Sequence, residues 1–303
     1  MKKFISLLMI LTLALTLMVG CGEKEKDYKL SIGVKVTENL AKSKLTETVA
    51  SIVTDADGKV VLCRIDSIDY TVKYENDALV KTAPVSKVAL GDSYSGMPAG
   101  TWEKQGKAFE NYVVGKTQSE IAATALDGGK VTDTELKASC SIDVTDILAA
   151  IDNAFKSEHK VAFKASSDLT AGLRASATVS DKTKDESKNV QLAVTYGAAV
   201  MADGKVVAAI LDTAEAQLNG INEENIATAL SYKGTKREQG DSYDSYAPMD
   251  AGRWYEQADR YAMAAAGLTA DNIATLATEG IAGCTINVTE YKAVLEAAVA
   301  AAK

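Results

Sequence analysis

The pattern of apolar and polar positions predicts strands followed by helices, and it does so twice along the chain. In residues 278–302, apolar positions recur with the 3.6-residue period of one helix face. This stripe consists of Tyr291, Val294, Leu295, Ala298, Val299 and Ala302. A degenerate version in residues 134–155 consists of Val144, Ile147, Leu148, Ile151 and Phe155. A turn of small residues precedes the stripe over 278–302. The free N–H groups at the start of this helix either bind a phosphate or only mark where the helix begins.

The parts of the chain that precede these helices read as strands. The segments KLSIGVKV (29–36) and KVAFKASS (160–167) each open with alternating apolar and polar residues. Asp57-Gly58 and Asp203-Gly204 stand between apolar runs, which predicts hairpin turns with positive φ at both central residues. The charged stretch 180–189 is expected to be an exposed hairpin loop.

The second part of each copy reads as helical. Trp102 and Phe109 share a helix face, as do Trp254 and Tyr261. The sequence Thr117-Gln-Ser-Glu120 is a capping-box pattern that predicts a further helix start. Strands followed by helices indicate an α+β fold in which helices cover one side of an antiparallel sheet.

Short sequences recur in the same order, which indicates a tandem repeat. ADGKVV occurs at 56–61 and 202–207, and GDSY occurs at 91–94 and 240–243. A tryptophan-led helix follows each GDSY, and Cys140-Ser141 near the end of the first copy matches Cys284-Thr285 in the second. We therefore assign residues 29–157 to repeat 1 and residues 158–303 to repeat 2, and we attribute the pair to duplication of one domain.

The N-terminus reads as the signal peptide of a bacterial lipoprotein. Two lysines precede an apolar run that is too short for a typical membrane span, and the run ends in Met18-Val19-Gly20-Cys21, which resembles a lipobox. This predicts a signal peptide over 1–20, lipidation at Cys21 and a charged tether over 21–28. The alternative is an ordinary signal peptide with an incidental cysteine. The lipid would anchor the protein on the extracytoplasmic face of the cell membrane.

Charge and composition exclude several classes of function. Removal of the signal changes the net charge from −8 to −10, and no basic stripe is present, so a nucleic-acid partner is not expected. His159 is the only histidine, which argues against a histidine-based metal cluster or a Ser-His-Asp triad. Besides Cys21 the chain has three cysteines, Cys63, Cys140 and Cys284, so at most one pair of these could form a disulfide.

With the strand, Asp-Gly turn, glycine loop and helix in this order, each copy resembles the FMN-binding domain family of bacterial surface lipoproteins and membrane electron-transfer complexes. That family carries a D-G-x-S-G-A-T type motif whose threonine can be joined to FMN through a phosphoester. Repeat 2 reads Glu279-Gly-Ile-Ala-Gly-Cys-Thr285, which keeps the glycines and the threonine but differs at three positions. Repeat 1 reads Glu135-Leu-Lys-Ala-Ser-Cys-Ser141 and keeps less.

The resemblance implies a flavin site in each copy. Thr285 would supply the ester oxygen in repeat 2, beside Gly283 and Cys284, and Ser141 would be the weaker counterpart in repeat 1. A flavin ring needs a flat apolar wall. The residues that could provide this wall are Trp102, Trp254, Tyr94 and Tyr243.

Each of these residues also has a structural interpretation. Thr285 suits a turn before a helix, and tryptophans at helix starts are commonly core residues. The recurrence of the GDSY loops also follows from duplication alone. The cysteines are either small packed residues or, for Cys140 and Cys284, thiols activated at a helix N-terminus. Cys63 lies in a predicted strand and is expected to be a packing residue.

Three functions follow. The first is a lipid-anchored flavin carrier that relays electrons between membrane redox proteins and external acceptors, without turnover of its own. The second is a non-catalytic binding or scaffold lipoprotein that kept the fold and lost the cofactor. The third is a solute-binding component of a transporter, which this order of strands and helices favours less.

Overall fold

The computed structural model describes residues 24–184, 187–244, 251–277 and 279–302. The predicted signal peptide and Cys21 lie outside these residues. The predicted tether over 21–28 is wrong at its end, because residues 26–28 belong to the first strand, β1 (Lys26–Asn39). Within the described ranges, no helix is both long enough and apolar enough to cross a membrane.

Two four-stranded antiparallel sheets form the centre of the molecule. The first has the strand order β3-β2-β1-β8 and the second the order β12-β11-β10-β9. The strands of the first sheet are β1 (Lys26–Asn39), β2 (Lys44–Thr54), β3 (Val60–Thr71) and β8 (Val161–Ala165). Those of the second sheet are β9 (Leu169–Asp181), β10 (Lys188–Ala202), β11 (Lys205–Ile221) and β12 (Ala229–Ser231). Two small hairpins add β4 (Tyr74–Glu75) with β5 (Ala78–Leu79), and β6 (Leu126–Asp127) with β7 (Lys130–Val131).

Helices follow the three long strands of each half. In the first half they are α1 (Lys87–Leu90), α2 (Trp102–Val113), α3 (Gln118–Ala122), α4 (Thr134–Ser139) and α5 (Thr145–Lys156). In the second half they are α6 (Lys236–Gln239), α7 (Asp241–Asp244), α8 (Trp254–Met263) and α9 (Thr289–Ala301). The 3-10 turns are η1 (Leu40–Lys42), η2 (Gly91–Ser93) and η3 (Ile273–Thr275). The capping box predicted at Thr117 and Glu120 is confirmed at the start of α3.

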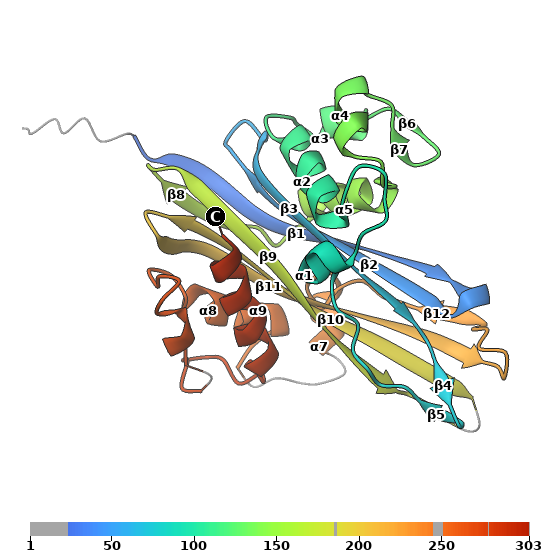
Figure 1. The fold of residues 1–303 in the computed structure, drawn as a ribbon. Coiled ribbons are helices and arrows are strands. Elements are labelled where there is room, and N and C mark those ends of the chain that lie inside the picture. Colours follow the sequence, from blue (N-terminus) through green and yellow to red (C-terminus); the bar gives the residue numbers. More distant parts are fainter. Residues whose placement is uncertain (1–23, 185–186, 245–250, 278, 303) are drawn as a thin grey trace, which may run out of the picture.

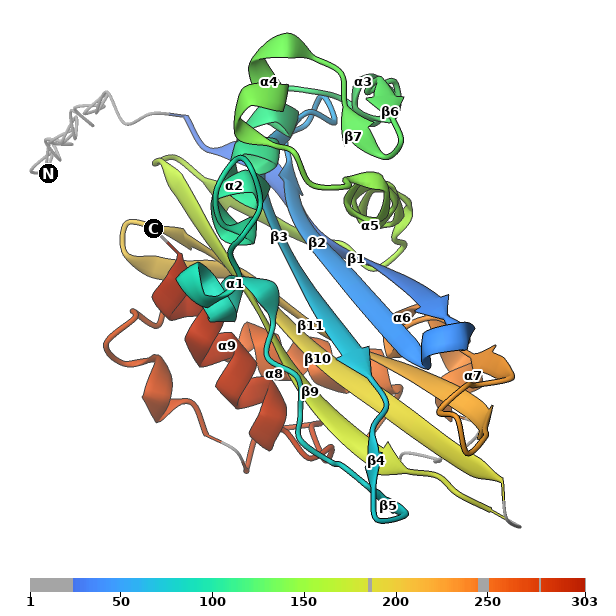
Figure 2. The ribbon, with the colours of Figure 1, turned by 45° about the vertical axis from the view of Figure 1, so that its right-hand side comes forward.

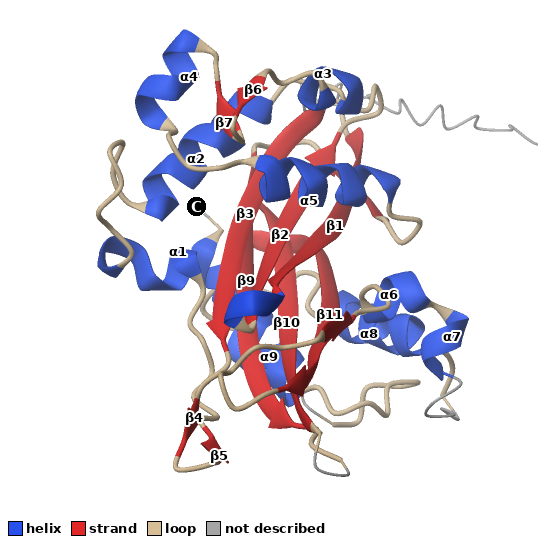
Figure 3. Ribbon diagram, turned by 90° about the vertical axis from the view of Figure 1, so that its right-hand side faces the viewer, coloured by secondary structure: helices blue, strands red, loops and turns tan. Residues whose placement is uncertain are grey.

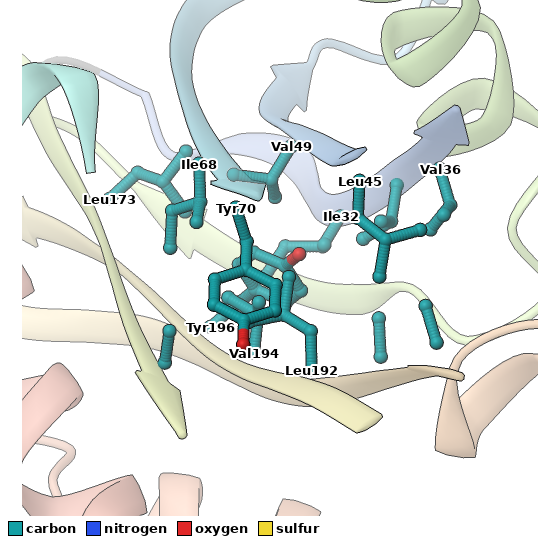
Figure 4. Close-up of a cluster of buried hydrophobic side chains, with 14 of the residues drawn as sticks. Ile32, Val36, Leu45, Val49, Ile68, Tyr70, Leu173, Leu192, Val194 and Tyr196 are labelled. Atoms are coloured by element: carbon teal, nitrogen blue, oxygen red, sulfur yellow. The ribbon is translucent and has the colours of Figure 1, made fainter. Parts of the chain in front are cut away.

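The elements make four layers: helices, sheet, sheet, helices. Helices α2 and α5 cover the outer face of the first sheet, and α8 and α9 cover that of the second (Figures 1 and 3). The inner faces of the two sheets pack on one another through aliphatic and aromatic side chains from both (Figure 4). The fold is therefore α+β with antiparallel sheets, as the order of strands and helices predicted.

The amphipathic stripes explain why the helices lie where they do. Tyr291, Val294, Leu295, Ala298 and Val299 of α9 are buried against the second sheet. The segment 134–155 forms two helices, α4 and α5, and the predicted stripe from Val144 to Phe155 belongs to α5 and its N-cap.

One glycine in each half permits a helix to approach its sheet closely. A Cβ atom on Gly33 of β1 would lie 2.1 Å from the backbone nitrogen of Ala154 in α5. A Cβ atom on Gly172 of β9 would lie 1.9 Å from the carbonyl oxygen of Ala298 in α9. Both crossings therefore require the absence of a side chain.

Two predictions about the strands are wrong in detail. At the β10–β11 turn both Asp203 (φ +50°) and Gly204 (φ +71°) have positive φ, as expected. At the β2–β3 turn only Gly58 does, because the Asp55 carboxylate accepts hydrogen bonds from the N–H groups of Asp57 and Lys59 and stabilises a longer loop.

The second correction concerns KVAFKASS. It forms β8, which pairs with β1 and so completes the first sheet; the first strand of the second sheet is β9. The alternating pattern identified a strand correctly, but it carries no information about which sheet edge the strand joins.

Candidate functional site

A lysine lies among aromatic rings in the first half, where the sequence predicted an aromatic wall. The Nζ atom of Lys87 in α1 lies 5.5 Å from the ring centroid of Tyr94 and 5.7 Å from that of Trp102. The same ammonium pairs with the Asp69 carboxylate of β3 at 3.3 Å. A cation over two electron-rich rings and beside a carboxylate is a stable arrangement, because the rings and the carboxylate both attract positive charge.

The second half repeats this arrangement. The Nζ atom of Lys236 lies 4.9 Å from the ring of Tyr243 and 5.5 Å from that of Trp254, and it pairs with Glu215 at 3.1 Å. Burial acts to lower the pKa of Lys236, but the neighbouring acidic groups of Tyr291, Glu215 and Tyr243 outweigh it and raise the pKa above its ordinary value.

The structure thus places the tyrosine and the tryptophan of each half, both candidates for the aromatic wall, around a lysine that the sequence analysis did not identify. A signal for it exists, because Lys87 and Lys236 each stand four residues before a GDSY sequence. The same spacing occurs in both halves, and it could have been found in the comparison of the two halves.

A buried aspartate holds the short helix of each half against its sheet. Asp66 on β3 accepts hydrogen bonds from the N–H groups of Ser67 at 2.8 Å and Val88 at 3.1 Å. Asp212 on β11 accepts from Thr213 at 2.8 Å and from Arg237 N–H at 3.2 Å. Burial raises the pKa of both carboxyl groups to about 6, although these hydrogen bonds oppose the shift.

The two indoles are core residues. Trp102 is 5% exposed and packs with Phe109 and Ile65, and Trp254 is 2% exposed and contacts the rings of Tyr243 and Tyr291. A flavin ring that stacked on either indole would have to displace these neighbours. In this conformation neither tryptophan presents the flat open wall that a flavin needs.

The cysteine loop of each half is held by a glutamine of the preceding long helix. Gln105 in α2 accepts hydrogen bonds through its Oε1 atom from the N–H of Ser141 at 2.7 Å and from its hydroxyl at 2.9 Å. Gln257 in α8 accepts from Thr285 in the same way, at 2.7 Å and 3.0 Å. Both hydroxyl groups that could carry a phosphoester are therefore engaged as donors.

Thr285 does not lie at a helix N-terminus. It precedes the first residue of α9, Thr289, by four positions, and the N–H of Thr289 donates to the Asn287 side chain. The predicted turn that feeds directly into a helix is therefore wrong in its geometry. Thr285 is nevertheless exposed, and Arg260 donates to the carbonyl of Gly283, two residues before it, at 2.7 Å.

The cysteines behave as packing residues. Burial raises the pKa of the Cys140 thiol and of the Cys284 thiol, and for Cys284 the Ile286 N–H and Arg260 only partly oppose the shift. This contradicts the reading of either as an activated thiol. Cys63 is buried in β3, as expected, and none of these three cysteines forms a disulfide.

Across the described ranges, no group of three or more His, Cys, Asp or Glu side chains could hold a metal ion. Comparison with family models, with curated proteins and with solved structures finds no match to this chain.

Proposed function

We propose that this protein is a lipid-anchored, extracytoplasmic binding or scaffold protein without a flavin and without turnover of its own. The observation that carries the proposal is the pair of glutamine–hydroxyl contacts. In both halves, the hydroxyl that a flavin phosphoester would need donates instead to a buried glutamine. A side chain that fixes the loop by two hydrogen bonds stabilises the fold and leaves the hydroxyl occupied.

The location rests on the N-terminal sequence. The lipobox-like tetrad that ends at Cys21 and the charged residues that follow it support a lipid anchor with the folded part held off the bilayer. A membrane surface, reached through the lipid on Cys21, is the partner that we propose.

The shared layout supports a common origin for the two halves. Each contains three long antiparallel strands, a short helix tied to a buried aspartate, a tryptophan-led helix and a final amphipathic helix. We propose that they are two copies of one FMN-binding-like domain in which the cofactor has been lost and the fold retained.

A flavin carrier is the second candidate, and one observation favours it for the second half. Thr285 is exposed, and the guanidinium of Arg260 lies at the adjoining Gly283, where a cation could pair with a phosphate. In that case the protein would pass electrons between membrane redox proteins and external acceptors. The equivalent Ser141 in the first half is partly buried.

Spectroscopy of protein purified from its native host distinguishes these candidates. The proposal predicts a colourless protein that shows no flavin fluorescence in a denaturing gel and takes up no added FMN. A fluorescent band would overturn it. Loss of that band in Thr285→Ala, with Ser141→Ala as the matched control, would then locate the flavin in the second half.

A further inference from the structure

A cleft of about 440 Å³ lies where the first half meets the end of the chain. Its walls come from β3, α1 and α2 of the first half, and from β9 and the last turn of α9 of the second. Figure 2 shows α1 between α2 and α9, with the described end of the chain nearby. The volume falls in the range of small-molecule sites, and the position between two packed units is a common one for such sites.

The charge of this cleft is opposite to that of the whole protein. Four basic side chains line it against two acidic ones, although the chain carries a net charge of −8. The basic residues are Arg64, Lys104, Lys107 and Arg174. The acidic residues are Glu103 and Glu110. A local excess of positive charge in an acidic protein attracts an anion.

Arg64, whose side chain is 17% exposed, is fixed in place before any ligand arrives. Arg64 donates from Nε to the carbonyl of Ala171 at 2.9 Å and from Nη1 to the carbonyl of Cys63 at 2.7 Å. The Glu110 carboxylate lies 3.4 Å from Nη1, and Lys107 lies 3.1 Å from the same carboxylate. This single carboxylate compensates two cations, so the cluster keeps a positive charge.

One side of the cleft is apolar. Trp102, Ile65, Val88 and Leu173 contribute to its lining, and Gly106 and Ala301 leave room between them. A ligand that combines an anionic group with a small apolar body would contact both kinds of surface.

The corresponding place in the other half is filled. Val88 and Arg237 are the second residues of α1 and α6, and the backbone N–H of each donates to the buried aspartate of its half. Arg237 extends into the junction and forms an ion pair with Asp259 at 2.5 Å. The cavity there is about 200 Å³. The first half therefore has a cleft because valine stands where the second half has arginine.

We propose that this cleft binds a small organic phosphate, a dianion that carries an apolar group. Lys104 also pairs with Asp92 at 3.8 Å, which leaves Arg64, Lys107 and Arg174 against Glu110 as the cations that face a phosphate monoester, whose charge near pH 7 is between −1.5 and −2. The apolar group would lie toward Val88 and Trp102, and the phosphate toward Arg64, Lys107 and Arg174. The inference rests on the proposed binding function and names the ligand class for it.

Calorimetric titration of the full-length protein in detergent tests the inference with phenyl phosphate as the probe. Phenyl phosphate is expected to bind at least about tenfold more tightly, or 1.4 kcal/mol, than inorganic phosphate, benzoate or phenol. Equal affinity for phenyl phosphate and inorganic phosphate would overturn the role of the apolar wall, and no heat with phenyl phosphate would overturn the site.

Two variants locate the binding. Val88→Arg, which introduces the residue of the second half, and Lys107→Gln, which removes an exposed cation, are each expected to weaken phenyl phosphate binding about tenfold or more. Lys156→Gln on the rim of the smaller cavity is the matched control and should bind as the unaltered protein does. Unchanged binding in Lys107→Gln contradicts the assignment even if Val88→Arg fails to fold. Flavin in the native protein would overturn the proposed function without affecting this titration.

Discussion

The two halves of the molecule agree in what holds each sheet to its own helices, and they differ where one half meets the other. Both halves have the close glycine crossing, the lysine among aromatic rings and the glutamine that holds the cysteine loop. At the junction, Val88 of the first half corresponds to Arg237 of the second, and a cleft of about 440 Å³ corresponds to one of about 200 Å³. The contacts that each half needs for its own stability are repeated, and the junction is where the two halves differ.

A hydrogen bond between the two facing sheets shows a second difference between the halves. Glu47 on β2 accepts a hydrogen bond of 2.6 Å from the hydroxyl of Tyr196 on β10, across the buried space between the sheets. Val49 pairs with Asp66 in the first sheet and Tyr196 pairs with Asp212 in the second, so Val49 and Tyr196 occupy equivalent positions in the two halves. Two residues earlier in each strand, Glu47 is equivalent to Val194. Each polar partner therefore has an apolar counterpart in the other half, so the pair fixes how the two unlike sheets face one another.

The largest effect is expected at the glycine crossings, where the two halves should respond alike. Gly33→Ala and Gly172→Ala each place a methyl group within about 2 Å of a helix backbone, so the helix must move away. Each change should lower the free energy of unfolding by about 3 kcal/mol or more, as measured by urea denaturation. Gly58→Ala, whose Cβ meets no atom within 4 Å but whose φ is +75°, separates backbone strain from steric overlap. A loss from only one crossing would contradict the structural equivalence of the halves.

Removal of an arginine at the junction should destabilise the protein more in the second half, at Arg237, than in the first half, at Arg64. Arg237→Met removes the ion pair with Asp259 and the hydrogen bond to the carbonyl of Leu211, in a side chain that is 4% exposed. We expect a loss of about 3 kcal/mol in urea denaturation, because the buried carbonyl of Leu211 remains without its donor and Asp259, whose side chain is 36% exposed, loses its partner. Arg64→Met should cost about half as much, since Glu110 keeps the Ile65 N–H and Lys107. Equal losses of stability in Arg237→Met and Arg64→Met would mean that the two sides of the junction are equally tightly packed.

Glu47 is expected to make stability depend on pH. Burial raises its pKa to about 8 from 4.5, against the opposing hydrogen bond from Tyr196. The folded protein therefore holds a proton that the unfolded chain releases, and stability decreases as the pH rises from about 4.5 to about 8. Between pH 5 and pH 9 the free energy of unfolding should fall by about 2–4 kcal/mol.

The variant Glu47→Gln tests this origin. It keeps an oxygen that can accept the Tyr196 hydrogen bond and removes the titration, so the decrease with pH should become markedly smaller. Asp66 and Asp212, whose pKa values are raised to about 6, should leave a residual decrease in both proteins. An unchanged pH profile in the variant would show that Glu47 does not titrate in this range.

The smallest expected difference concerns the glutamines that hold the cysteine loops. Gln105→Ala removes an acceptor from the partly buried Ser141, and Gln257→Ala removes one from the exposed Thr285, which water can rehydrate. We expect losses of about 2 and about 1 kcal/mol, respectively, in thermal denaturation. A larger loss for Gln257→Ala would contradict the view that the second loop is the more open one.

The sequence predicted those features that depend on a local period or on a turn residue. The stripe of α9, the capping box at Thr117 and the positive φ of Asp203 all follow from nearby residues. The place of β8 did not, because a strand pattern does not specify its pairing partner. The geometry of the first Asp-Gly turn also differed, because the Asp55 side chain competes for the turn N–H groups.

The candidate site was predicted in part for the same reason. The sequence analysis gave Tyr94, Trp102, Tyr243 and Trp254 as possible wall residues, and the structure places Lys87 near the two rings of the first half and Lys236 near those of the second. The glutamines join residues far apart in sequence, and no local pattern marks such a contact. The cleft between the halves likewise depends on how two units pack, which periodicity does not encode.

Intact-mass spectrometry of the protein from its native host tests the central claim most directly, because one spectrum reports both the lipid on Cys21 and the presence or absence of a flavin. The proposal predicts a chain that begins at a lipid-modified Cys21 and carries no flavin ester on Ser141 or Thr285. A mass that includes a phosphoester-linked flavin, or a chain that keeps its first 20 residues, would contradict it.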